Sequence, residues 1–257
     1  MSPAAPLEPE LAESDAWSSM LGDDVATVGP AIVCHAPGVD SIMLNRVQGL
    51  GIARPATDQD LEEIGELYGS TVHAISLAPT ARPAELEGML RARGYAPGYA
   101  WVKFVRPVTD LAPVETSLRV ELIGPDLAEE FARVITKAYG IPPGIGPDLA
   151  GLPGRPGWSC YLAFDGDTAA AAGALHVGPA GGWLGAAGTL PEFRKRGGQG
   201  AIMIARIRRA AEMGAQLVVT ETGENLPDRP SNSYRNILRH GFKVAYVRPN
   251  FVSGAGD

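Results

Sequence analysis

Apolar and polar positions alternate in short segments, and the second half of the chain predicts a definite order of elements. Runs of apolar or small residues predict strands over 160–164, 169–177, 182–190, 216–220 and 243–247. Helical spacing of apolar residues predicts helices over 199–213 and 232–240, and Gly241 ends the second. The expected order is therefore three strands, a helix, a strand, a helix and a last strand.

The first half repeats the later part of this order. The matching segments are 61–68 with the helix after Gly200, 73–77 with 216–220, 85–93 with 232–240, and 104–107 with 246–249. This alignment also places the pair Gly94–Tyr95 on Gly241–Phe242. Internal duplication explains the matches, although a helix followed by a glycine, an aromatic residue and a strand is also a common order by itself.

Composition and charge narrow the class of protein. The chain has 257 residues, is 45% hydrophobic and 20% charged, and is long enough for one large or two smaller domains. Its net charge is −7, and no Lys or Arg precedes Arg46, so the acidic excess lies in residues 1–45. Residues 1–20 therefore predict an acidic flexible leader, either a solubilising tail or an attractor for a cationic substrate. A chain with this charge is a poor candidate for binding nucleic acid.

The remaining features define the domains and the compartment. The segment 108–113 separates the halves, so we expect domains over 21–113 and 114–257, and the loop 141–157 is rich in Gly and Pro. The two cysteines cannot form a disulfide framework, and with the histidines they show no zinc-ligand spacing. No signal peptide and no membrane-spanning apolar run is present, so a cytoplasmic protein without a metal or a membrane partner is expected.

The turn before the helix at 199–213 carries the strongest chemical signal. From Arg194 to Arg209 the chain has basic residues and no acidic residue, and Arg206 and Arg209 mark a polar face of the helix. The first turn contains no Ser, Thr, Asp or Asn that could cap it. Glycines let an anion approach the backbone N–H groups, so the turn predicts a phosphate or pyrophosphate site. The alternative is a solvated turn with a scattered basic face.

The corresponding place in the first half provides an internal control. There Thr57 can cap the helix, and Asp60 follows three residues later as in a capping box. Asp58, Glu62 and Glu63 add negative charge. A phosphate ligand is therefore expected in the second half only. The chain lacks a Gly-x-x-x-x-Gly-Lys-Ser/Thr loop and a Gly-x-Gly-x-x-Gly turn after a strand, which weakens kinase and dinucleotide readings.

The sequence resembles the GNAT superfamily of acetyl-CoA-dependent N-acetyltransferases. Their fingerprint is Gln/Arg-x-x-Gly-x-Gly/Ala after Pro-x-aromatic, and here Pro191-Glu-Phe193 precedes Arg194-Lys-Arg-Gly-Gly-Gln-Gly200, with Gln199 in place of the second Gly/Ala. The resemblance covers about residues 116–250. It implies an α/β fold with a mixed, mostly antiparallel sheet flanked by helices, and here a degenerate GNAT-like N-terminal half without the cofactor loop.

The resemblance also implies the site. Acetyl-CoA would be the acyl donor, held by a set of residues at the end of a strand and in the turn after it: Ala187, Gly188, Thr189, Arg194, Lys195, Arg196, Gly197, Gly198, Gln199, Gly200 and Ala201. Two central strands of the family splay apart beside this turn. An amine would attack the acetyl carbonyl directly, in a ternary complex, with a base for its proton and an acid for the thiolate.

The acid and the base are less defined. The family often has a tyrosine four residues before the Gly-Phe pair, where this chain has Ile237, so Tyr234 is the candidate acid, with a packing tyrosine as the alternative. Glu221 is the candidate base, with a solvated carboxylate at a strand end as the alternative. His176 and Cys160 are expected to be structural.

The acceptor is expected to be a primary amine of a small molecule. In the family the acceptor site would include Tyr139, Trp158 and Tyr246, with the loop 141–157 as a wall or lid. Its identity does not follow from the sequence, which also leaves a homodimer open. Two other functions remain: a non-catalytic acyl-CoA sensor, and an interaction module that has kept the fold without the ligand.

Overall fold

The computed structural model describes residues 7–22, 25–109, 111–141 and 146–254 in two compact units. The first unit comprises 1–103, 221–234 and 244–257, and the second comprises 104–220 and 235–243. The boundary expected at 113 is therefore wrong, because the chain passes between the units several times. Residues 1–6 of the expected leader and 142–145 of the expected lid lie outside the described residues.

The second unit is built around a sheet whose strands run in the order β12-β6-β11-β10-β9-β8-β7 within the described part of the chain. Its elements are β7 (Arg119–Ile123), η2 (Pro125–Leu127), α4 (Ala128–Tyr139), α5 (Gly146–Ala150), β8 (Trp158–Asp165), β9 (Thr168–Gly178), β10 (Gly181–Thr189), η4 (Pro191–Phe193) and α6 (Gly198–Glu212). Then follow β11 (Leu217–Gly223), α7 (Asn232–Arg239) and β12 (Lys243–Arg248), of which residues 221–223, 232–234 and 244–248 belong to the first unit. Strands β7 to β10 pair antiparallel, and β10 pairs parallel with β11.

The first unit has a sheet with the order β1-β2-β3-β4-β13-β5 among the described residues. Its elements are α1 (Glu8–Leu21), β1 (Ala26–Val28), β2 (Ala31–Cys34), β3 (Arg46–Gln48), α2 (Asp58–Tyr68), β4 (Ala74–Ser76), α3 (Leu86–Ala92), β5 (Ala96–Pro97) and β13 (Asn250–Val252). Strand β6 (Trp101–Pro107) begins in this unit and passes at residue 104 into the second. Its apolar core includes Leu61 and Ile64 of α2, Leu86 and Leu90 of α3, and Phe251 of β13. Apolar residues at helical spacing thus face the sheet, as the pattern predicts.

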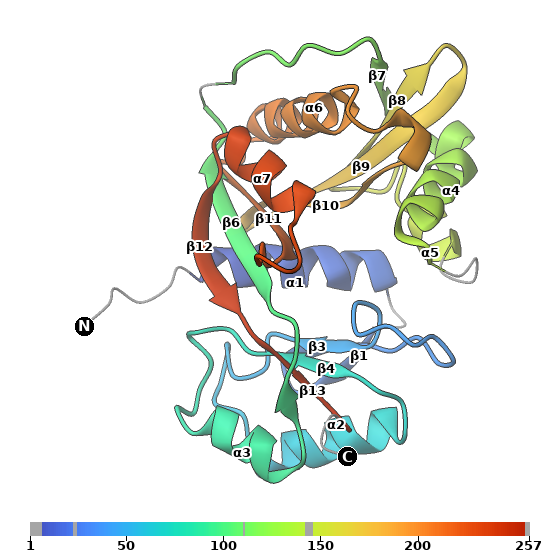
Figure 1. The fold of residues 1–257 in the computed structure, drawn as a ribbon. Coiled ribbons are helices and arrows are strands. Elements are labelled where there is room, and N and C mark those ends of the chain that lie inside the picture. The colour runs from blue at the N-terminus through green and yellow to red at the C-terminus, as the bar shows by residue number, and fades with distance from the viewer. Residues whose placement is uncertain (1–6, 23–24, 110, 142–145, 255–257) are drawn as a thin grey trace. The chain divides into compact units, whose positions relative to one another are not determined.

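The two halves repeat one order of elements and exchange a strand. Three strands, a helix, a strand and a helix occur as β1-β2-β3-α2-β4-α3 and again as β8-β9-β10-α6-β11-α7. In each set the third and fourth strands pair parallel. Strand β13, from the end of the chain, lies between β4 and β5, and β6, from the first half, lies between β11 and β12 (Figure 1). This reciprocity supports the internal duplication and explains why the units are discontinuous in sequence.

The strands and helices expected in the second half are confirmed to within a few residues. The segments 160–164, 169–177 and 182–190 correspond to β8, β9 and β10, and 199–213 and 232–240 correspond to α6 and α7. Strand β13 was not expected, because Pro249 interrupts the pattern immediately before it.

The expected flexible leader is wrong for the residues that the structure describes. Residues Glu8–Leu21 form α1, and Pro9 is tolerated because it lies in the first turn. Glu10 and Glu13 are only 2% and 0% exposed, one helical turn apart on the same face. The acidic residues that suggested a solvated tail therefore include two that hold the helix in place, through basic partners far away in the sequence.

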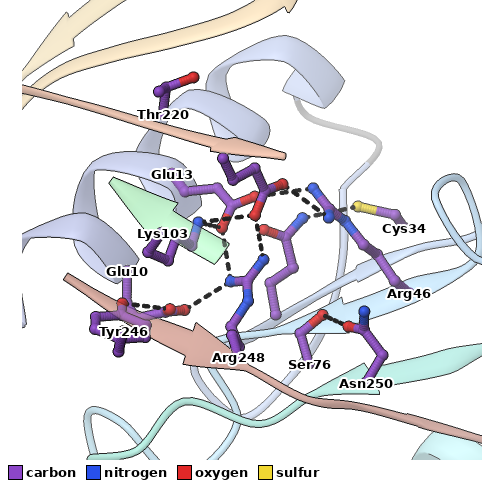
Figure 2. Close-up of polar contacts among 12 residues, drawn as sticks. Glu10, Glu13, Cys34, Arg46, Ser76, Lys103, Thr220, Tyr246, Arg248 and Asn250 are labelled. Atoms are coloured by element: carbon purple, nitrogen blue, oxygen red, sulfur yellow. Dashed lines mark hydrogen bonds and ion pairs between the residues drawn. The ribbon is translucent and has the colours of Figure 1, made fainter. Parts of the chain in front are cut away.

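A buried ion cluster fixes α1 within the first unit (Figure 2). Glu13 forms ion pairs with Arg46 of β3 at 2.9 Å, with Arg248 of β12 at 2.7 Å, and with Lys103 of β6. Glu10 accepts hydrogen bonds from Arg248 at 2.9 Å and from the Tyr246 hydroxyl at 2.6 Å. Burial opposes the charged form of Glu13, but the three cations outweigh it and hold its pKa well below the usual value.

Replacing Glu13 by Gln should strongly destabilise the protein, because three buried cations then lose their shared carboxylate. Breaking a buried ion pair costs about 3–5 kcal/mol, and this loss should appear in urea denaturation of the purified protein. Glu8→Gln is the matched control, since Glu8 is exposed on the same helix. A loss that is equal in the two variants would contradict the role of the cluster.

Acidification should reveal how much the same cluster contributes to stability. The pKa of Glu13 is lowered in the folded state, so its contribution to stability is complete above the unfolded pKa of 4.5 and is lost as the pH falls below it. Between pH of about 5 and 3 the free energy of unfolding should therefore fall more steeply for the wild type than for Glu13→Gln. Parallel pH profiles for the two proteins would contradict this assignment.

Candidate functional site

The turn between β10 and α6 is the candidate anion site, and it lies within the second unit. Helix α6 begins at Gly198, after an N-cap at Gly197 with φ of 81° in the left-handed region. No side chain forms a capping hydrogen bond, and the first turn contains no acidic residue. The N-terminal N–H groups of this 15-residue helix thus lack a capping side chain.

Two glycines of this turn are closely packed, and Gly197 is also required by its left-handed conformation. A Cβ on Gly197 would lie 2.4 Å from the carbonyl oxygen of Glu115, and a Cβ on Gly200 would lie 2.4 Å from His240 Nε2. The hydroxyl of Thr116 donates a hydrogen bond of 2.7 Å to the Arg196 carbonyl and fixes the turn from the other side. The turn is therefore held by its backbone surroundings and not by a ligand-like side chain.

The polar side chains of the turn fall into two groups. Arg196 is engaged with Asp165 through two hydrogen bonds of 2.7 and 2.8 Å, and Gln199 accepts one from the Thr189 hydroxyl at 3.0 Å. Arg194 and Lys195 are exposed. These two cations remain at the surface of the turn, where they can add positive charge to the field of the helix.

The equivalent helix of the first unit satisfies its own N-terminus, as the sequence predicts. Thr57 and Asp60 of α2 form a capping box, and Asp60 also accepts hydrogen bonds of 2.8 and 2.6 Å from Arg54. The hydrogen bond from Arg54 is the main cause that lowers the pKa of Asp60 to about 2. A carboxylate and its arginine thus occupy the entrance of α2, whereas no side chain caps α6.

The strand that leads into this turn loses its parallel partner. Strand β10 pairs with β11 only from Gly182↔Val218 to Leu184↔Thr220, although β10 continues to Thr189. Its pairing with β9 shifts register between Gly185 and Gly188, which leaves one extra residue on β10. The last part of β10, with the expected donor-binding residues 187–189, is therefore irregular and unpaired with β11 on that side.

Aromatic side chains line the face of the sheet on which α4 packs. Trp158, His176 and Trp183 lie directly opposite one another on β8, β9 and β10. The ring of Trp183 covers Gly185, where an added Cβ would lie 1.7 Å from it. Tyr139, at the end of α4, donates a hydrogen bond of 2.9 Å to the Ala187 carbonyl. Two of the expected acceptor residues, Tyr139 and Trp158, thus lie on this face.

The expected catalytic residues belong to the first unit. Glu221 Oε1 accepts a hydrogen bond from Arg46 at 3.1 Å, and its Oε2 accepts one from Arg248 at 2.6 Å and pairs with Lys103 at 3.1 Å. Glu221 is therefore part of the buried ion cluster, and its role as a base stays a prediction. Tyr234 lies in the first turn of α7, where its backbone N–H donates to the Ser231 hydroxyl. The expected acceptor residue Tyr246 contacts Glu10.

Two residues of the second unit were misjudged or missed by sequence reasoning. Arg206, expected on a polar helix face, is 1% exposed. Trp183 was not singled out, although alternation along 181–185 could have placed it on the same face as Gly185. Cys160 is buried as expected, and burial raises the pKa of its thiol to about 12, so it is not an activated nucleophile.

The described residues contain neither a cluster of metal-ligating side chains nor a helix that could span a membrane. No three His, Cys, Asp or Glu side chains gather there as metal ligands. No helix in that part of the chain is both long and apolar enough to cross a bilayer.

Solved acetyltransferase structures share this fold at low sequence identity. A GCN5-related N-acetyltransferase from Kribbella flavida is 16% identical with a TM-score of 0.67, over 98% of this chain and 98% of that chain. Another, from Sphaerobacter thermophilus, is 13% identical with a TM-score of 0.61, over 97% and 93%. A tandem GNAT protein from the clavulanic acid biosynthesis pathway is 14% identical with a TM-score of 0.56, over 80% and 73%.

No family model matches the sequence, and none of the curated proteins is similar to it. The structural likenesses nevertheless agree on the architecture. The chain has the GNAT fold, a mixed and mostly antiparallel sheet flanked by helices. The fold expected from the motif at 191–200 is thereby confirmed.

Replacing Gly197 by Ala should destabilise the protein through both strain and a clash with the backbone oxygen of Glu115. Gly214→Ala is the matched control at the other end of α6, since Gly214 also has a left-handed φ, of 89°, but faces open space. The control should lose about 1–2 kcal/mol and Gly197→Ala clearly more, measured by thermal or urea unfolding. Equal losses would mean that the turn is not packed as described.

Proposed function

We propose that the protein is an acetyl-CoA-dependent N-acetyltransferase that transfers an acetyl group to a primary amine of a small molecule. The observation that carries the proposal is the entrance of α6, which begins on Gly197 and Gly198 without a capping side chain. An anion completes such a helix start, and a pyrophosphate is large enough to contact several N–H groups at once. The GNAT fold makes the pyrophosphate of acetyl-CoA the fitting ligand.

The donor would lie along residues of the second unit. In this proposal the backbone of 195–200 binds the pyrophosphate, and exposed Arg194 and Lys195 add positive charge. The end of β10 at 187–189, which pairs with β9 but not with β11, would offer backbone groups on its free side to the pantetheine arm and the acetyl carbonyl. Both parts of one extended ligand are then bound by consecutive segments of the chain.

The proposed reaction is direct transfer. The amine nitrogen attacks the acetyl carbonyl carbon, the C–N bond forms and the C–S bond breaks, and the sulfur leaves as thiolate or thiol. Backbone N–H groups would stabilise the oxyanion, and Tyr234 would protonate the sulfur. The amine proton would pass to Glu221 or to water. The Glu221 route requires that carboxylate to give up contacts with Arg46, Lys103 or Arg248.

A non-catalytic acyl-CoA sensor is the second candidate. It is favoured by two observations: Ile237, buried at 4% exposure, stands where the family often has tyrosine, and the candidate base is held in ion pairs. Both candidates require acetyl-CoA binding, and only the enzyme also requires turnover.

Acetyl-CoA binding should be abolished or strongly weakened by Gln199→Glu, measured by isothermal calorimetry. Gln199 is the second residue of α6, so this nearly isosteric change puts a carboxylate among the N–H groups without removing a glycine. The fold should tolerate it, because a negative charge in the first turn stabilises a helix. We expect an affinity loss of at least about tenfold, corresponding to 1.4 kcal/mol.

Gln59→Glu is the matched control, since Gln59 is the second residue of α2 in the first unit. It should bind acetyl-CoA as the wild type does. At a ligand concentration of about 100 times Kd, the wild type and this control should both gain about 2.7 kcal/mol in stability. No acetyl-CoA binding by the wild type, or equal binding by all three proteins, would overturn the proposed site.

Turnover separates the two candidate functions. An enzyme should release CoA from acetyl-CoA in the presence of some member of a panel of small primary amines. A thiol-reactive dye measures the CoA that is released. Tyr234→Phe should lower kcat while leaving the calorimetric affinity for acetyl-CoA unchanged, because it removes a proton donor and keeps the ring. Binding without CoA release across the panel would favour the sensor.

A further inference from the structure

Arg206 is a buried cation of the second unit for which the proposed function has no use so far. It lies on α6 with 1% of its surface exposed. Burial lowers its pKa to about 10, so it still carries a positive charge at neutral pH. Within the described part of the chain, no carboxylate pairs with it, and its Nη1 donates to two backbone carbonyls instead. A buried charge without a countercharge is costly, so its position calls for an explanation.

The two carbonyls mark the place where β10 becomes irregular. Nη1 donates to Ala174 of β9 at 2.8 Å and to Gly185 of β10 at 3.1 Å. Ala174 and Gly185 are partners across the strands, and they are the last regular pair before the register shift. After the shift, Gly188 pairs with Ala172, so β10 uses three steps where β9 uses two. Arg206 thus bridges both strands at the edge of the bulge.

The residues around this contact are shaped to receive the guanidinium. Gly173 lies opposite the bulge, and an added Cβ there would lie 3.0 Å from the Cζ atom of Arg206. Ala186, inside the bulge, has φ of 40°, a left-handed conformation that a residue with a side chain seldom adopts. Such a conformation persists only when its surroundings impose it. The two hydrogen bonds from Arg206 hold the residue before it, and the hydrogen bond from Tyr139 to the Ala187 carbonyl holds the residue after it.

We propose that Arg206 is a positioning residue that holds the bulge of β10 in the form that receives the pantetheine arm and acyl group of the donor. The inference rests on the proposed function and deepens it. Arg206 acts from behind the strand, through the Gly185 carbonyl, and the bulge fixes the direction of the N–H and C=O groups of 186–188. The hydrogen bonds of Arg206 go to Ala174 and Gly185 and not to the turn at 195–200.

The test compares two ligands on Arg206→Met, Arg206→Lys and wild type by isothermal calorimetry. Acetyl-CoA reaches both the turn and the bulge, whereas 3′-phospho-ADP, its phosphate-bearing part, reaches only the turn. Arg206→Met should bind acetyl-CoA about tenfold more weakly and 3′-phospho-ADP within about twofold of the wild type. Arg206→Lys keeps the charge but not the planar guanidinium, so its affinity for acetyl-CoA should fall between those of the wild type and Arg206→Met.

Arg208→Met is the matched control, because Arg208 is exposed on the same helix. It should bind both ligands as the wild type does. The inference is overturned if Arg206→Met binds acetyl-CoA with wild-type affinity, or loses both ligands equally. If Arg206→Met does not fold, the same two criteria apply to Arg206→Lys. If the wild type binds neither ligand, the proposed function itself has failed, and that result is read before any variant is made.

Discussion

The constraint that organises this protein is that the first N–H groups of a helix need acceptors, and its two halves meet that need differently. At the start of helix α2, Asp60 forms the capping box with Thr57 and also pairs with Arg54. Side chains of the protein therefore cap this helix. Helix α6 starts on glycines and has cations beside it. The two helices occupy equivalent places in one repeated order of elements. The difference therefore lies in a few entrance residues, and the architecture alone would not reveal it.

The exchange of β6 and β13 makes the halves interdependent. Strand β13 pairs with both β4 and β5, so the first sheet needs a strand from the C-terminal part of the chain to join these two. The ion cluster reinforces this arrangement, since Glu13 of α1 draws its cations from β3, β6 and β12. Contacts over such long separations slow folding, because closing long loops costs conformational entropy. A chain cut at residue 113 would separate β13 from its partners.

The sequence predicted the local elements and the entrance turn, and it missed what depends on distant partners. The spacing of apolar residues was sufficient for α6 and α7, and Thr57 with Asp60 was sufficient for the cap of α2. Glu10 and Glu13 looked like a solvated acidic run, because their cations lie at least 33 residues away. Arg206 looked like a surface residue for the same reason. Its guanidinium fits beside Gly173 of β9 because that residue has no side chain.

Glu221 is the residue on which the proposed chemistry and the fold make competing demands. It directly follows the last pair between β10 and β11, which made it the candidate base, yet both its carboxylate oxygens hold cations of the ion cluster. If Glu221 took up the amine proton, Arg46, Lys103 and Arg248 would share only Glu10 and Glu13 as counterions. Uncompensated charge in a buried place is expensive. An amine that arrives uncharged and loses its proton to water after attack avoids this cost, and it leaves the cluster free to hold α1 and β6 throughout the reaction.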